Sequence, residues 1–147
     1  MKKKLTVGVF LILAVVLVAS IVVVGDADAA KPVRTMTVNM STIPDGTGNC
    51  TLIAEAPFEG YRALGYDVRW YELDGPFKYQ VGREISYFVS GATRSGTLEL
   101  VCVDYKGDVA PQPCGPTYEV YVELIRKNGK PIRNAWARDF EICECTP

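Results

Sequence analysis

The sequence predicts an all-β protein, an antiparallel β-sandwich of about seven or eight strands that follows an apolar N-terminal helix. Runs rich in Val, Ile, Thr and aromatic residues recur about every 8–12 residues, the spacing of short strands in a sandwich. Clusters of Gly, Pro, Asn and Asp separate these runs and supply the turns. After the apolar start, the sequence has no convincing long amphipathic helix, whose apolar residues would recur with a period of about 3.6.

The beginning of the chain has the three parts of a secretory signal peptide. Three lysines come first, an uncharged and mostly apolar run occupies residues 5–24, and the small residues Ala27 and Ala29 follow. The apolar run is also long enough to span a bilayer, since about 20 residues suffice. We therefore predict that residues 1–29 are a signal peptide or membrane anchor and residues 30–147 an exported domain. The domain is secreted if the chain is cut after Ala29, and anchored outside the membrane by residues 5–24 if it is not.

Composition limits the chemistry of the exported domain. The chain contains no histidine, which excludes Ser-His-Asp triads, Cys-His pairs and His-ligated metals. Its formal net charge is −1, and a nucleic-acid partner would require a dense basic face. We predict a protein that is not an enzyme, holds no cofactor or metal, and binds no nucleic acid.

Two strands are predicted before residue 65. Residues 33–40 form the first, which ends at a cluster of turn residues from Ser41 onward. Residues 50–55 form the second, and Pro57 is expected to stop it because proline has no amide to donate to a ladder. Residues 60–65 are then a loop or a single helical turn.

Three strands are predicted in the middle of the chain. Residues 65–72 alternate, with Trp70 on the apolar face, and end at the turn-forming Gly75. Residues 84–89 alternate again. Residues 97–105 are apolar on both faces, which predicts a central strand.

A hairpin is predicted near the carboxyl end. Residues 118–126 should pair back on residues 132–137, because Asn128-Gly129 accepts the two positive φ angles of a type I′ turn. Pro131 indicates that the returning strand lies at an edge. Residues 139–145 form a last short strand.

One segment resembles the third strand of an immunoglobulin-like domain. It runs from Val68 to Gly75, with Trp70 as the aromatic residue of the core. Cys50 before it and Cys102 after it stand where that family bridges its two sheets. The residue two before Cys102 is Leu100, where the family has a tyrosine. The resemblance implies an immunoglobulin-like sandwich and leaves the function open.

Five cysteines lie in the exported part, where disulfides form, so at most two internal bridges can form among them. Cys102 and Cys114 flank a short loop and form one candidate pair. Cys143 and Cys145 point to the same face of a strand and should not bridge each other, and one of them is expected to meet Cys50. The rival pairing is Cys50 with Cys102, across the sandwich. A thiolate metal site is the alternative for Cys143 and Cys145. It is the weaker one, because export favours disulfides over free thiolates.

Aromatic side chains crowd residues 58–79. Alternation assigns Trp70, Tyr66 and Phe77 to the core and Tyr71 to the opposite face. The candidate binding residues are three tyrosines that would form a stacking or protein-binding patch if they are exposed together: Tyr61, Tyr71 and Tyr79.

These observations predict a secreted or membrane-anchored binding or structural module of the cell surface. Its partner would be a protein or glycan at the cell surface, or a second copy of the chain that pairs with the edge strand at residues 33–40. The alternative is a secreted inhibitor of an extracellular enzyme, which would present the cysteine-bounded loop at residues 103–113.

Overall fold

The computed structural model describes residues 33–145, and the predicted leader, residues 1–29, lies outside them. The described chain consists of strands joined by turns and contains no helix, and so no helix that could cross a membrane. The nine strands in order are β1 (Thr35–Met36), β2 (Asn39–Pro44), β3 (Asn49–Ala63), β4 (Gly65–Asp74), β5 (Phe77–Tyr87), β6 (Thr93–Val101), β7 (Gln112–Pro113), β8 (Thr117–Ile125) and β9 (Pro131–Ile142).

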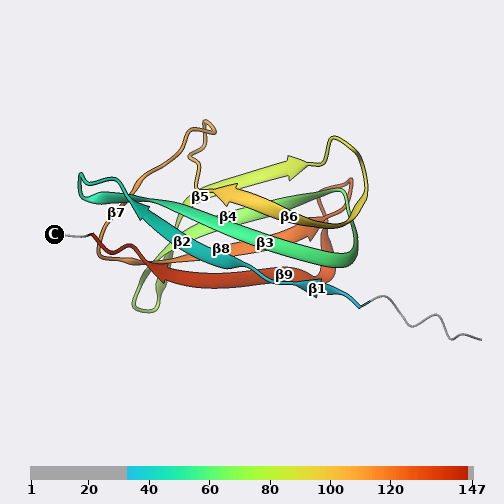
Figure 1. Ribbon diagram of the computed structural model, residues 1–147, viewed down its shortest axis with the longest axis horizontal. Coiled ribbons are helices and arrows are strands. Elements are labelled where there is room, and N and C mark those ends of the chain that lie inside the picture. The colour runs from blue at the N-terminus through green and yellow to red at the C-terminus, as the bar shows by residue number, and fades with distance from the viewer. Residues whose placement is uncertain (1–32, 146–147) are drawn as a thin grey trace, which may run out of the picture. The chain divides into compact units, whose positions relative to one another are not determined.

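The strands form two antiparallel sheets (Figure 1). In the first sheet, β3 is the centre. Its residue Ile53 pairs with Ser41 of β2 on one side and with Val101 of β6 on the other. The short strands β1 and β7 extend these two sides. The second sheet has the order β5-β4-β8-β9. The all-β class and the antiparallel pairing are therefore confirmed.

Alternating residues from both sheets fill one core between them. Trp70 in β4 is completely buried, as the alternation of its strand predicted. Tyr118 near the start of β8 is also buried, and its hydroxyl donates a hydrogen bond to the carbonyl of Pro113 (2.8 Å). Each large apolar side chain that is fully buried stabilises the fold by about 1.5–3 kcal/mol. Phe77, which was assigned to the core, is instead 61% exposed, because the β4–β5 hairpin carries it past the packed region.

The strand β3 is much longer than predicted, because Pro57 does not stop it. The carbonyl of Pro57 accepts a hydrogen bond from the amide of Thr37 (3.1 Å). In an antiparallel strand the amide and carbonyl of one residue point to the same side. The side of Pro57 that has no amide hydrogen therefore faces the break between β1 and β2, where the absence of one ladder hydrogen bond destabilises the sheet little. The expected loop at residues 60–65 is also wrong, since β3 runs to Ala63 and β4 begins at Gly65.

Two further predictions are wrong in detail. Residues 97–105 were predicted as a central strand, but β6 pairs only with β3 and is an edge strand. The β8–β9 hairpin forms as predicted, yet its turn is not type I′. Gly129 has a φ of 73°, whereas Asn128 does not have a positive φ, and the amide of Gly129 donates to the carbonyl of Arg126. This is a longer loop, closed by a glycine in the left-handed conformation.

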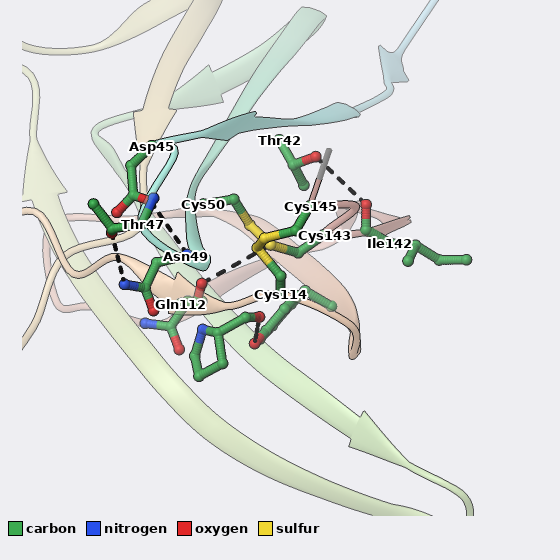
Figure 2. Close-up of a disulfide and its surroundings, with 12 residues drawn as sticks. Thr42, Asp45, Thr47, Asn49, Cys50, Gln112, Cys114, Ile142, Cys143 and Cys145 are labelled. Carbon is green, nitrogen blue, oxygen red and sulfur yellow. Dashed lines mark hydrogen bonds between the residues drawn. A yellow bond between two sulfur atoms is a disulfide. The ribbon is translucent and has the colours of Figure 1, made fainter. Parts of the chain in front are cut away.

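Two disulfides join segments that are far apart in the sequence (Figure 2). Cys50 at the start of β3 is bonded to Cys143, and Cys114 is bonded to Cys145. The prediction that Cys50 meets one of the two C-terminal cysteines is confirmed, whereas the Cys102–Cys114 and Cys50–Cys102 pairings are wrong. Cys102 is a free thiol, completely buried between β6 and β5. Disulfides of this kind indicate an oxidising, extracytoplasmic environment.

Candidate functional site

The second sheet turns a polar and aromatic face to solvent, which we call the outer face. Every second residue of its four strands points to this side. The pairing register aligns these residues in rows across the sheet. The three central rows are Ile85-Asp67-Glu123-Trp136, Arg83-Arg69-Tyr121-Arg138 and Gln80-Tyr71-Glu119-Phe140.

The centre of the outer face is an ion-pair network. The carboxylate of Asp67 accepts hydrogen bonds from Arg83 (2.7 Å) and Arg69 (2.6 Å), and Arg69 also reaches Glu123 (2.8 Å). Burial of Asp67 would raise the pKa of its carboxyl, but the bonds and charges of the two arginines more than offset this and hold the pKa below its ordinary value. Arg69 therefore stands in a fixed orientation at the middle of the sheet.

A second buried carboxylate lies on the same face. Glu119 is only 2% exposed, and both of its oxygens accept hydrogen bonds from the ammonium group of Lys78 (2.7 Å). The ammonium group also lies 5.4 Å from the ring centre of Tyr71. The pair is held between β5 and β8, so it links an edge strand to the middle of the sheet.

Aromatic rings surround these charges. Tyr121 stacks on Trp136 with 5.8 Å between ring centres, and the guanidinium carbon of Arg69 lies 5.7 Å from the ring centre of Tyr121. Arg138 lies 5.6 Å from the ring of Phe140. Trp136 and Phe140 remain 48% and 44% exposed, so rings held by neighbours still present a large apolar surface.

The solvent face of the first sheet is different in character. Its central part is lined by small, aliphatic and acidic residues, among them Ser41, Ile53 and Glu99. In the described chain, all ion pairs belong to the second sheet. Among the surfaces formed by residues 33–145, only the outer face combines charges held in ion pairs with exposed rings.

The three predicted tyrosines do not lie together. Tyr61 is buried, and its hydroxyl donates to the carbonyl of Asn134 (2.7 Å). Tyr71 belongs to the outer face, as alternation predicted. Tyr79 is 53% exposed beside Phe77, on the other side of the β4–β5 hairpin.

The exposed rings of β9 were missed by the sequence analysis. Residues 132–137 were predicted as the returning strand of the hairpin, and residues 139–145 as a separate short strand. The signal was present, because Trp136, Arg138, Phe140 and Ile142 alternate along one continuous strand.

The loop at residues 103–113 is ordered without a bridge between Cys102 and Cys114. The carboxylate of Asp104 accepts hydrogen bonds from the amides of Lys106 (2.7 Å) and Asp108 (3.1 Å), and Val103 pairs with Val109. These contacts hold Tyr105 at the tip of the loop, where it is 90% exposed.

No group of three or more Cys, Asp or Glu side chains within residues 33–145 is placed to hold a metal ion, and Cys143 and Cys145 are consumed by the disulfides. Comparison of the chain with models of protein families finds no match. Searches against curated proteins and against solved structures find none either.

Proposed function

We propose that this protein is a non-enzymatic binding module displayed outside the membrane, and that it binds a protein partner through the outer face. The observation that carries the proposal is the residue composition of that face. Trp, Tyr and Arg are the residue types that contribute most to binding energy in protein interfaces. Here they are Trp136 in β9, Tyr121 in β8 and Arg69 in β4, three adjacent strands, with Tyr121 in contact with both of the others.

The fixed arrangement of these side chains favours binding further. Binding normally loses free energy because flexible side chains become ordered, about 0.5–1.5 kcal/mol for each long one. Arg69 is already held by Asp67 and Glu123, and Trp136 is already stacked. Binding of a partner at this face would therefore cost less side-chain entropy than binding at a face whose side chains rotate freely.

We also propose that the domain is immunoglobulin-like in the finer sense. The three-stranded part β2-β3-β6 matches strands A, B and E of that class, and β5-β4-β8-β9 matches C′, C, F and G. Tyr118, near the start of the F-like strand and bonded to the carbonyl five residues earlier, supports the same assignment. The fold class itself implies no function, so the proposed binding rests on the side chains themselves.

Site-specific photo-cross-linking in the full-length protein at its natural location tests the proposed face. A benzophenone amino acid at Phe140 should capture one defined protein, identified by mass spectrometry, and Trp136→Ala should lower the yield at least fivefold. The matched control places the same amino acid at Glu99, on the solvent face of the first sheet, and should give no such adduct. Equal adducts from both positions, or none from Phe140, would refute the proposal.

The second candidate function is inhibition of an extracellular protease by the loop at residues 103–113. The exposed Tyr105 at the tip of a hydrogen-bonded turn favours it. The protein should inhibit at least one member of a panel of serine, cysteine and metalloproteases, and replacing the loop by Gly-Ser should abolish inhibition. A panel without any inhibited member ends this candidate.

A further inference from the structure

A pocket lies at the end of the domain opposite the disulfides, and we call this region the basic end. Its volume is about 640 Å³. Four segments of the chain converge on it: the residues before β1, the end of β3 with the turn into β4, the loop before β6, and the β8–β9 hairpin. The cations that line it are Arg34, Arg62, Arg126 and Lys127.

Backbone hydrogen bonds bring these cations together. The amide of Leu64, in the β3–β4 turn, donates to the carbonyl of Ile125 (2.9 Å), which places Arg62 beside the start of the β8–β9 hairpin. The buried hydroxyl of Tyr61 fixes β3 to β9 through Asn134, and the guanidinium of Arg34 lies 6.0 Å from the ring of Tyr61. The pocket is thus built by ladder and core contacts and does not depend on attraction among its charged groups.

The four cations have no carboxylate of residues 33–145 within 4.0 Å. Arg126, Lys127 and Arg62 are exposed, and like charges at close range repel one another. A concave surface lined by one sign of charge concentrates its field in the cavity and raises the local concentration of ions of opposite charge. Within residues 33–145, the pocket is therefore a positive site that no carboxylate neutralises.

We propose that this pocket binds a phosphate group of a multiply charged anionic ligand. Arginine presents a planar fork of donors that matches the oxygens of phosphate, and three arginines and a lysine can neutralise more than one negative charge. Leu64 and Ile132 add apolar wall to the same pocket, which can cover the uncharged part of the ligand next to its phosphate. The site is separate from the outer face and does not rest on the proposed partner there.

Two sources can supply such a group: a phospholipid headgroup or a soluble phosphate ester. If the leader is retained in a membrane, phospholipid headgroups are available as the source. If the leader is removed, soluble ligands remain.

The experiment uses the exported protein as it is isolated, with two probes. Pyrophosphate is titrated by calorimetry at low salt, and sedimentation compares vesicles of phosphatidylglycerol with vesicles of phosphatidylcholine. A retained anchor affects both vesicle types equally, so only the difference between them is read. Binding of pyrophosphate alone assigns a soluble source, and preference for phosphatidylglycerol assigns a headgroup, and either result supports the site.

Charge variants locate the site. Arg126→Glu should weaken the binding at least tenfold, and Arg126→Lys less, because lysine keeps the charge and loses the fork. The matched control is Lys106→Glu, which makes the same change of charge in the loop at residues 103–113 and should leave binding unchanged. Equal weakening by Lys106→Glu would show attraction by overall charge only, and absence of binding to both probes would likewise overturn the proposal. If neither probe binds and the protein instead associates with itself in a salt-sensitive way that Arg126→Glu abolishes, the basic end is a self-association surface and the proposal is overturned.

Discussion

At the disulfide end of the domain, two bridges hold three segments of the chain together, whereas at the basic end four segments meet without a covalent link. The two ends also differ in the sign of the charges that they carry. Loops and strand ends at the disulfide end carry more acidic than basic residues, Asp45, Asp74, Asp104, Asp108 and Glu144 beside Lys106, and those at the basic end carry Arg34, Arg62, Arg126, Lys127 and Lys130. Covalent stabilisation is therefore concentrated away from the cations of the basic end, so that stability and binding can be altered separately.

Removal of the disulfides should have the largest effect on stability. The bridge Cys50–Cys143 spans 93 residues and Cys114–Cys145 spans 31, so restriction of the unfolded chain gives about 5 and about 4 kcal/mol, respectively. We expect Cys50→Ala/Cys143→Ala to lower the free energy of unfolding in urea more than Cys114→Ala/Cys145→Ala does. If Cys50→Ala/Cys143→Ala does not fold at all, the same prediction requires that Cys114→Ala/Cys145→Ala still folds. The reverse order would contradict the chain-entropy explanation.

Tyr118 should have an intermediate effect, with a dependence on pH. Burial above all, with the charges of Glu72 and Cys102 adding to it, raises the pKa of Tyr118 from 10.0 to about 12. The folded state then keeps a proton that the unfolded chain releases, so stability falls as the pH rises from about 10 to 12. Tyr118→Phe should cost about 1 kcal/mol at neutral pH through the lost hydrogen bond to Pro113, and should make the alkaline decline shallower.

Two controls sharpen the reading of Tyr118→Phe. Burial also raises the pKa of the free thiol of Cys102 from 9.0 to about 12, so part of the alkaline decline should remain in the variant. Tyr79→Phe, which removes the hydroxyl of an exposed ring, is the control for loss of a tyrosine hydroxyl as such and should leave the free energy of unfolding at neutral pH nearly unchanged. An unchanged profile for Tyr118→Phe would show that this hydroxyl does not titrate differently on unfolding.

Substitutions at the basic end should have the smallest effect on stability. Arg62→Ser and Arg126→Ser remove exposed cations that have no carboxylate partner within residues 33–145, so the free energy of unfolding should change by no more than about 0.5 kcal/mol. At low salt a slight gain is expected because repulsion is relieved. Arg69→Ser, which breaks bonds to Asp67 and Glu123, is the comparison and should be clearly more destabilising. A loss at Arg126 equal to that at Arg69 would mean that the basic end is structural.

The sequence could predict what depends on neighbouring residues. The alternation around Trp70 and the β8–β9 hairpin at Asn128-Gly129 are local patterns, and both formed. The passage of β3 through Pro57 could not be predicted, because it depends on the break in the strand beside it. Cys102 was compared with a bridging cysteine of immunoglobulin-like domains, yet it follows β6 directly and is a free thiol, and this depends on pairing between distant segments.

The candidate sites were harder to predict than the fold. The outer face depends on the register of four strands, which no single segment specifies. The pocket at the basic end joins residues 34, 62 and 126, and only the closed sheets bring them into proximity. Only Tyr71 was assigned to the outer face beforehand, because the period of its own strand sufficed.

The bond between Cys50 and Cys143 turns the intervening polypeptide into a covalent ring. A single cut by an extracellular protease within that ring, for instance beside the protruding Tyr105, would leave both fragments attached to each other. Such a nick would change the mobility of the protein on a gel only after reduction. The domain can therefore be cut in this exposed loop without releasing any part of itself.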